Sequence, residues 1–183
     1  MKNPIKKLNQ GFTIIEVMIV LAIAGLIMAI VFVAVPQLQR NQRDNARQDI
    51  ANRLKAELET YAGNNQGTYP FAAVAVSPGV QCNTQAVVAG TKNCGDWFTR
   101  YINGATPVKI TDPGTGANTR IFYYSNVVQP TWQVGDAFIV VGHKCSGEQV
   151  AQGVAATGVA TSKQYAILIS LDRSGTFYCI DNG

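Results

Sequence analysis

The sequence predicts an α+β fold in which one long N-terminal α-helix packs on a four-stranded antiparallel β-sheet. Three observations lead to this prediction. An apolar run covers residues 12–35, a helical periodicity follows it, and residues 64–183 hold 21 Val and Ile but only two Leu, a bias typical of strands. The helix is expected to have an apolar, membrane-spanning half and an amphipathic half, the spine. The β-rich remainder is the head.

Charged residues are scarce in this chain. Its 183 residues are 47% apolar and 14% charged, whereas an average soluble protein is about 25% charged. The apolar content excludes a disordered chain. Lys2, Lys6 and Lys7 supply three charges of the net +4. A nucleic-acid-binding protein shows a basic patch on a folded face, and no such patch is visible in the sequence.

The run Phe12–Val35 is long enough to cross a membrane. Of its 24 residues 21 are apolar, and a helix of this length spans about 36 Å. A secretory signal peptide is the alternative, because Met1–Gln10 is basic, but its apolar region has about 7–15 residues and ends at a small-residue cleavage site. All four cysteines follow the run. Because disulfides persist outside the cytosol, we expect the part after the run to be exported.

Glu16 is the one charged residue in this apolar run. An ionised side chain at the centre of a membrane span costs about 2.5–3.5 kcal/mol on insertion scales, and less near the interface. No Lys or Arg lies between Lys7 and Arg40 to offset this cost. Either Glu16 reaches the lipid headgroups, or a cation from elsewhere pairs with it. A newly made α-amino group at Phe12, in the same chain or in a neighbour, would be such a cation.

The residues around Gly11 resemble the processing site of type IV prepilins and pseudopilins. Lys6-Lys7-Leu8-Asn9-Gln10-Gly11 is followed by Phe12-Thr13-Ile14-Ile15-Glu16-Val17. The resemblance implies that a membrane aspartic peptidase cuts between Gly11 and Phe12 and that the new Phe12 amine is N-methylated. It also implies that Glu16 guides an incoming subunit by pairing with a Phe12 amine in the growing filament.

The helix has two weak points, Gly25 and Pro36. Pro36 closes the apolar run, and because a proline inside a helix removes a hydrogen bond, we expect a kink there. Gly25 lowers helix propensity. The family resemblance implies that the stretch between such a Gly and Pro can lose helical order in a filament and make the filament extensible.

The spine shows one narrow apolar face. Its apolar residues recur at helical spacing and suit a helix that lies on a sheet: Ala46, Ile50, Leu54, Leu58 and Tyr61. Asp49 and Arg53, four residues apart, are expected to pair. The helix is expected to stop at Gly63-Asn64-Asn65. The following Gly67-Thr68-Tyr69-Pro70 resembles the Gly-x-Tyr-Pro turn that comes after this helix in many pilins and pseudopilins.

Four strands are expected in the head: Arg120–Ser125, Ala137–Gly142, Tyr165–Leu171 and Thr176–Ile180. The last two are joined by Asp172-Arg173-Ser174-Gly175, a turn in which the glycine supplies a positive φ. Asp96 is expected to cap a short helix that runs to Ile102. The stretch Gln149–Thr161, rich in Gly, Ala and Thr, is expected to be a loop.

The four cysteines, Cys82, Cys94, Cys145 and Cys179, allow three disulfide connectivities. Sequence order suggests Cys82–Cys94 and Cys145–Cys179. Zinc is the alternative, but the chain has no Cys-x-x-Cys pair. The second bridge resembles the disulfide-bounded C-terminal region of pilins.

No enzymatic activity, metal or cofactor is expected. The one candidate for nucleophilic catalysis is His143 with Cys145, alternate residues near a strand end that can face the same side. The alternative is an exposed His beside a half-cystine. Asp172, Asp181 and Asn182 resemble the calcium-binding C-terminal loop of major pseudopilins, but EF-hand spacing is absent.

Together these features predict a type IV pilin that polymerises through its N-terminal helix. The expected parts are a leader peptide (1–11), a transmembrane and assembly helix (12–35), the spine (36–63) and the disulfide-bonded head (64–183). The partners would be prepilin peptidase, the pilus assembly platform with its ATPase, and further copies of the chain. The protein would start as a single-pass cytoplasmic membrane protein and end in an extracellular pilus. The alternatives are a pseudopilin of a type II secretion or DNA-uptake machine and, from another class, a membrane-tethered binding protein that never polymerises.

Overall fold

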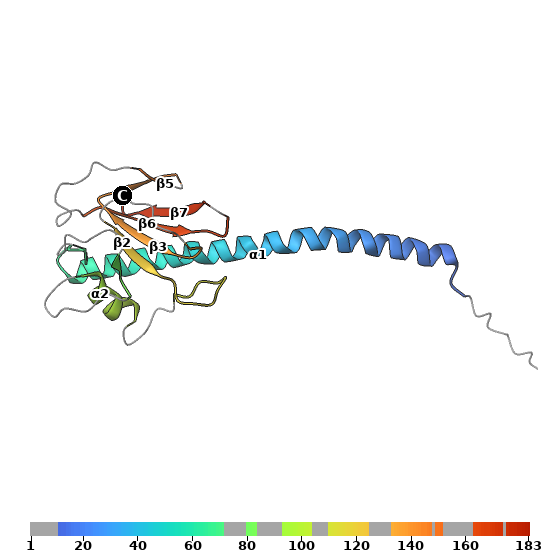
Figure 1. Cartoon of the computed structure of the whole chain (residues 1–183), viewed down its shortest axis with the longest axis horizontal. Coiled ribbons are helices and arrows are strands. Elements are labelled where there is room, and N and C mark those ends of the chain that lie inside the picture. Colours follow the sequence, from blue (N-terminus) through green and yellow to red (C-terminus); the bar gives the residue numbers. More distant parts are fainter. Residues whose placement is uncertain are drawn as a thin grey trace, which may run out of the picture. The chain divides into compact units, whose positions relative to one another are not determined.

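The computed structural model describes residues 11–71, 80–83, 93–103, 110–124, 133–147, 149–151, 163–173 and 175–183. It divides the chain into two compact units, Met1–Asn41 and Gln42–Gly183. The expected leader residues 1–10 and most of the expected loop 149–161 lie outside the described residues. Figure 1 labels most of the helices and strands. They are α1 (Ile14–Asn64), β1 (Val80–Gln81), α2 (Cys94–Trp97), the π-helix η1 (Phe98–Ile102), β2 (Ile121–Tyr124), β3 (Ala137–Val141), β4 (Lys144–Ser146), β5 (Gln149–Ala151), β6 (Tyr165–Ser170) and β7 (Phe177–Asp181).

The long N-terminal helix is present as predicted, and α1 includes both weak points. Its helical conformation continues across Gly25 and Pro36, so the proline does not end the helix. The helix ends at Asn64, inside the expected stop signal. Gln66 and Gly67 then take positive φ values of 57° and 74°, and the Gly67 N–H donates to the Ala62 carbonyl at 2.8 Å. This turn satisfies a carbonyl that the end of the helix would otherwise leave free.

The main sheet has the strand order β1-β2-β3-β6-β7, in which β1 has only two residues. The four longer strands begin and end within one residue of the predicted bounds. Their pairing is mixed, because β2 and β3 run parallel in the register Ile121↔Ala137, while β3–β6 and β6–β7 are antiparallel. The prediction of a fully antiparallel sheet is therefore wrong. Residues 125–136 between β2 and β3 form a connection of about a dozen residues, which is long enough for a parallel crossover.

A second, small sheet also differs from the prediction. β4 and β5 pair antiparallel in the register Cys145↔Val150, so Gln149–Ala151 are strand residues and not part of a loop. The preceding Gly147 has a φ of +63°, which suits a tight turn between the two strands.

The core lies between α1 and one face of the main sheet. Figure 1 shows the strands of this sheet beside the C-terminal part of α1. On the helix, Ile50, Leu54 and Leu58 are buried, and they belong to one apolar cluster with Ile121, Ile139 and Ile167 of the sheet. Tyr124, Phe138, Val140 and Leu168 form a second cluster. The two clusters take alternate residues of the same strands, as the two faces of a sheet require.

Two local predictions about polar residues are corrected. The short helix is capped by Asn93, whose side-chain oxygen accepts the Asp96 N–H at 2.8 Å, so Asp96 lies in the first turn and is not the cap. The ion pairs among the described residues do not include Asp49–Arg53, and both residues are exposed. An exposed pair of this kind contributes only a few tenths of a kcal/mol, about 0.3–0.5, which is little to hold two mobile side chains together.

Candidate functional site

The Gly11–Phe12 bond lies in non-helical chain just ahead of α1. Residues 11–13 have no helical conformation, and the helix begins at Ile14. Phe12 is 86% exposed, and the structure places no atom within 4 Å of a Cβ built at Gly11. Because a peptidase binds its substrate as extended chain, an exposed glycine outside the helix is a bond that a cleft can reach.

The start of α1 is closed by a reciprocal contact between Thr13 and Glu16. The Thr13 N–H and hydroxyl donate to Glu16 Oε2 at 3.5 and 3.3 Å, and the Glu16 N–H donates to Thr13 Oγ1 at 3.4 Å. This arrangement is a capping box, in which each residue satisfies a free group of the other. Sequence reasoning found Glu16 but missed Thr13, although the pattern Thr-x-x-Glu ahead of an apolar run is the signal for it.

Thr13 also bears on the anomaly of Glu16. The carboxylate has no cation beside it in the sequence, but the structure gives it two hydrogen-bond donors from Thr13. In the uncleaved chain the Phe12 nitrogen belongs to a peptide bond and carries no charge. The pairing of Glu16 with a Phe12 amine therefore stays a prediction.

The apolar half of α1 is not covered by any of the residues that the structure describes. Every residue from Gly11 to Gln42 is exposed, including the large apolar residues from Phe12 to Val35. By length and composition alone, α1 is a helix that could cross a membrane. A continuous apolar surface of this extent marks contact with a membrane or with another protein.

The end of the spine is joined to the Gly67–Pro70 turn and to the sheet through Glu59. Its two carboxylate oxygens accept the hydroxyls of Tyr165 at 2.6 Å and of Tyr69 at 2.9 Å. Burial, with the Glu59 hydrogen bond next, raises the pKa of both tyrosines above its ordinary value. Tyr69 of the Gly-x-Tyr-Pro turn thus connects the end of α1 to β6, which gives the turn a physical role.

Two disulfides hold the head together, and their pairing is the one that sequence order suggested. Cys82 is bonded to Cys94, and Cys145 is bonded to Cys179. The sequence separations are 12 and 34 residues. In the chain-entropy model such loops stabilise a fold by about 3 and 4 kcal/mol.

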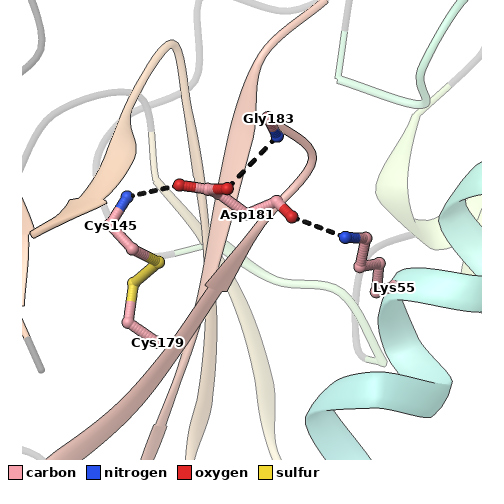
Figure 2. Close-up of a disulfide and its surroundings, with 5 residues drawn as sticks. All are labelled: Lys55, Cys145, Cys179, Asp181 and Gly183. Atoms are coloured by element: carbon pink, nitrogen blue, oxygen red, sulfur yellow. Dashed lines mark hydrogen bonds between the residues drawn. A yellow bond between two sulfur atoms is a disulfide. The ribbon is translucent and has the colours of Figure 1, made fainter. Parts of the chain in front are cut away.

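The second disulfide lies beside an anchored chain end, as Figure 2 shows. Asp181 Oδ2 accepts the Cys145 N–H at 2.7 Å, and Asp181 Oδ1 accepts the Gly183 N–H at 3.2 Å. The main-chain carbonyl of Asp181 accepts from Lys55 Nζ at 2.6 Å. The end of β7 is therefore linked to β4 by the disulfide and a hydrogen bond, and to α1 by Lys55.

His143 and Cys145 do not form a thiol–imidazole pair. Cys145 is a half-cystine and has no thiol to activate. His143 is 6% exposed, so the expectation of an exposed histidine is also wrong, and its Nδ1 lies 2.8 Å from the Val141 carbonyl. A buried ring bonded to the backbone has a structural role here.

The three residues that resembled a calcium loop do not converge. Asp172 lies in the turn before β7, where Arg43 and Arg47 contact its carboxylate, whereas Asp181 is the last residue of β7. Asn182 Oδ1 accepts the Tyr165 N–H at 3.0 Å. Among the residues that the structure describes, no group of three or more His, Cys, Asp or Glu side chains could hold a metal ion.

Comparison with known proteins gives one match, and it falls on the N-terminal segment described above. The family model for the prokaryotic N-terminal methylation motif matches residues 6–32, from the lysines ahead of Gly11 into the apolar half of α1. Comparison of the chain with curated proteins and with solved structures gave no significant match.

The matched motif belongs to structural subunits rather than to a family of enzymes. It implies processing by a peptidase and assembly into a pilus or pseudopilus, and the apolar helix fits a protein that is anchored in a membrane before assembly. The chain carries, at residues 6–32, the class III prepilin signal of the type IV pilins and pseudopilins.

Proposed function

We propose that this protein is a type IV pilin, cut after Gly11 and polymerised through α1 into a surface filament. The observation that carries the proposal is a Gly-Phe bond in exposed, non-helical chain ahead of an uncovered apolar helix with Glu16 as its one charge in residues 12–35. Prepilin peptidase removes residues 1–11, and Phe12 becomes the N-methylated first residue. The assembly platform and its ATPase then lift the subunit out of the membrane.

Assembly follows from the chemistry at the start of α1. Before cleavage, Thr13 gives the Glu16 carboxylate two hydrogen-bond donors, but neither donor carries a charge. Cleavage creates an ammonium group at Phe12. A charge-assisted hydrogen bond is roughly twice as strong as a neutral one, and an apolar environment strengthens it further. The Phe12 amine of a neighbouring subunit can therefore replace Thr13 as the partner of Glu16 and set the register of the filament.

The parts of the chain have separate tasks in this proposal. Residues 1–11 are the removable leader, 12–35 the assembly helix, 36–63 the spine and 64–183 the displayed head. Gly25 and Pro36 bound a stretch of α1 that extends when the filament is pulled. Before assembly the protein is held in the cytoplasmic membrane with its head outside, and after assembly it is extracellular.

The test of the register role is Glu16→Ala, with Ile15→Val as the matched control on the same turn of α1. We expect Glu16→Ala to fold and insert into the membrane normally but to give far fewer filaments, because the incoming amine has no partner. The control should assemble like the unmodified chain. Filament yield is measured by electron microscopy of sheared surface material. A normal yield from Glu16→Ala would contradict the role assigned to this residue.

Mass spectrometry of the same material tests the processing step. The expected chain begins at an N-methylated Phe12. A chain that begins near Pro36 would instead indicate conventional secretion.

The composition of the surface fibres distinguishes the three candidate functions. Fibres made mainly of this chain support the proposal that it is a type IV pilin. A short fibre confined to the cell envelope indicates a pseudopilin of a secretion or DNA-uptake machine, and processed protein that stays in the membrane without fibres indicates a tethered binding protein.

A further inference from the structure

The first two turns of the spine in the second unit are attached to the head differently from the turns that follow. In residues 42–49, all of which the structure describes, Arg47 is the one buried side chain, and it is 1% exposed. Apolar packing starts at Ile50 and continues through Leu54 and Leu58. Charged groups, rather than apolar contacts, therefore hold residues 42–49 on the head.

Five charged side chains from three segments make this attachment. Arg47 Nε contacts Asp112 Oδ1 at 2.6 Å, and its Nη1 contacts Asp172 Oδ1 at 2.9 Å and Asp44 Oδ1 at 3.0 Å. Arg43 contacts Asp172 Oδ2 through both Nε and Nη2, each at 2.6 Å. The Asp172 N–H donates to Asp44 Oδ1 at 2.8 Å. The helix thus supplies two cations and one anion, and each of two loops supplies one anion.

Asp112 is also held by contacts that do not involve the helix. Its Oδ2 accepts the N–H groups of Gly114 at 3.0 Å and Thr115 at 2.9 Å. On its other side lies Gly135, where any Cβ would meet the carboxylate. The acceptor for Arg47 is therefore held by its own loop as well as by α1.

The electrostatic balance favours the ionised states of Arg47, Asp112 and Asp172. Burial acts to raise the pKa of Asp112 and of Asp172, but hydrogen bonds from Arg47, Arg43 and Thr115 outweigh it, and both pKa values lie below the usual one. Burial likewise acts to lower the pKa of Arg47, but hydrogen bonds and charge from Asp112 and Asp172 raise it above the usual value. Each arginine of the group therefore depends on ionised carboxylates beside it, and each carboxylate depends on an arginine.

We propose that Arg43, Asp44 and Arg47 of α1, with Asp112 and Asp172, form a detachable ionic latch that sets how many turns of α1 are bound to the head. When the latch is closed, the helix is held from residue 43 onward. When it opens, residues 42–49 leave the head, while the apolar packing from Ile50 onward keeps the fold together. This conformational device goes beyond the proposed function, because it operates within one chain whether or not that chain polymerises.

The latch opens as a unit for a physical reason. If Asp112 loses its charge, the buried Arg47 Nε faces a neutral acceptor in place of an ionised one, and leaving the head restores the hydration of the guanidinium. Ile50, Leu54 and Leu58 lose apolar burial if they follow, so they stay. Residues 42–49 that have left the head no longer have the tertiary contacts that protect them, so their amide protons exchange faster.

The test is amide hydrogen exchange on the full chain in detergent micelles, with Asp112→Asn compared with Asp136→Asn. Both carboxylates are 5% exposed and paired with an arginine, but the partner of Asp136 is Arg120, which is not on α1. In Asp112→Asn we expect exchange of residues 43–49 and of the Asp172 amide to rise at least about tenfold, with residues 50–62 unchanged. In Asp136→Asn these amides should keep their original rates.

Arg43→Gln provides a milder second variant. The Arg43 side chain is 34% exposed, and its removal leaves the contact of Arg47 with Asp112 intact. A smaller rise confined to the same amides supports the latch. The proposal is overturned if residues 43–49 do not respond to either variant, if they respond equally to Asp136→Asn, or if residues 50–62 open together with them.

Discussion

Gly135, just before β3, is a residue whose replacement the structure tolerates poorly. Its φ is +87°, a region that residues with a Cβ rarely adopt, and an added Cβ would run into the Asp112 carboxylate. Gly116, with a φ of +70°, has nothing within 4 Å of the same position. Replacing Gly116 therefore measures the cost of a positive φ alone, whereas replacing Gly135 adds the cost of the contact between the new Cβ and Asp112.

We predict that Gly116→Ala lowers the free energy of unfolding by about 1–2 kcal/mol, the cost of a left-handed conformation. Gly135→Ala should cost roughly 2 kcal/mol more, because the methyl group displaces Asp112. Urea unfolding of the full chain in micelles, followed by the near-ultraviolet circular dichroism of the head, measures both. Equal losses from the two variants would mean that Asp112 moves aside without cost.

Some polar residues of the site could be predicted from the sequence and others could not. The proposed processing residues Gly11 and Phe12 and the proposed register residue Glu16 could be named from their order alone, since each occupies a fixed place in a motif. The capping role of Thr13 does not follow from the charge of Glu16, which says nothing about the hydrogen-bond partners of its carboxylate. Arg47 was missed because a periodicity of apolar residues passes over a cation, although Arg47 lies three and seven residues before Ile50 and Leu54, on the same helix face.

At the scale of elements, α1 carries the same residue type in two opposite settings. Leu54 on the spine is fully buried against the sheet, whereas Leu38 is 59% exposed in the first unit. Both lie in one uninterrupted helix. Truncation of each leucine therefore distinguishes the contribution of core packing from that of helix propensity.

Leu54→Ala is expected to destabilise the head by about 2–5 kcal/mol, because it leaves a cavity between α1 and the sheet. Leu38→Ala should change the free energy of unfolding of the head by no more than about 0.5 kcal/mol. Chemical denaturation of the two full-length variants gives the comparison. A loss of similar size from Leu38→Ala would contradict the finding that α1 contributes to the core only from Ile50 onward.

The elements of the head were predictable to different degrees. The four main strands could be located because Val, Ile and aromatic residues alternate or cluster between turn residues. The parallel pairing of β2 with β3 could not, because a strand's own residues do not state its direction and the connection is too long to enforce a hairpin. β4 and β5 were missed because each has three residues, too few to show a period.

At the scale of the whole molecule, buried tyrosines make the stability of the fold depend on pH in alkaline solution. Burial raises the pKa of Tyr61 on α1 and of Tyr123 on β2 to about 12. Both belong to the cluster that joins the helix to the sheet. Their neutral forms are the ones that the folded state accommodates, so the folded state binds more protons than the unfolded state above the ordinary value of 10.0.

We therefore expect the stability contributed by these two groups to be complete below pH 10 and to be lost as the pH rises toward about 12. Tyr61→Phe should lessen this loss, because the Tyr61 hydroxyl has no hydrogen-bond partner among the described residues and its removal leaves the ring packing intact. Unfolding free energies at a series of pH values, with the absorbance of ionised tyrosine recorded in parallel, check the result. An unchanged alkaline limit in Tyr61→Phe would contradict it.

The fastening of the last three residues has a practical consequence. Asn182 binds Lys163 and Tyr165, Asp181 binds Cys145 and Lys55, and Gly183 is exposed at the end of this anchored stretch. A fluorophore joined to Gly183 would thus rotate with the head rather than swing on a loose tail, and its emission anisotropy would report the orientation of the head in living cells. A label on Met1 would be discarded with the leader if the proposed cleavage occurs. Gly183 is therefore a better labelling site than Met1.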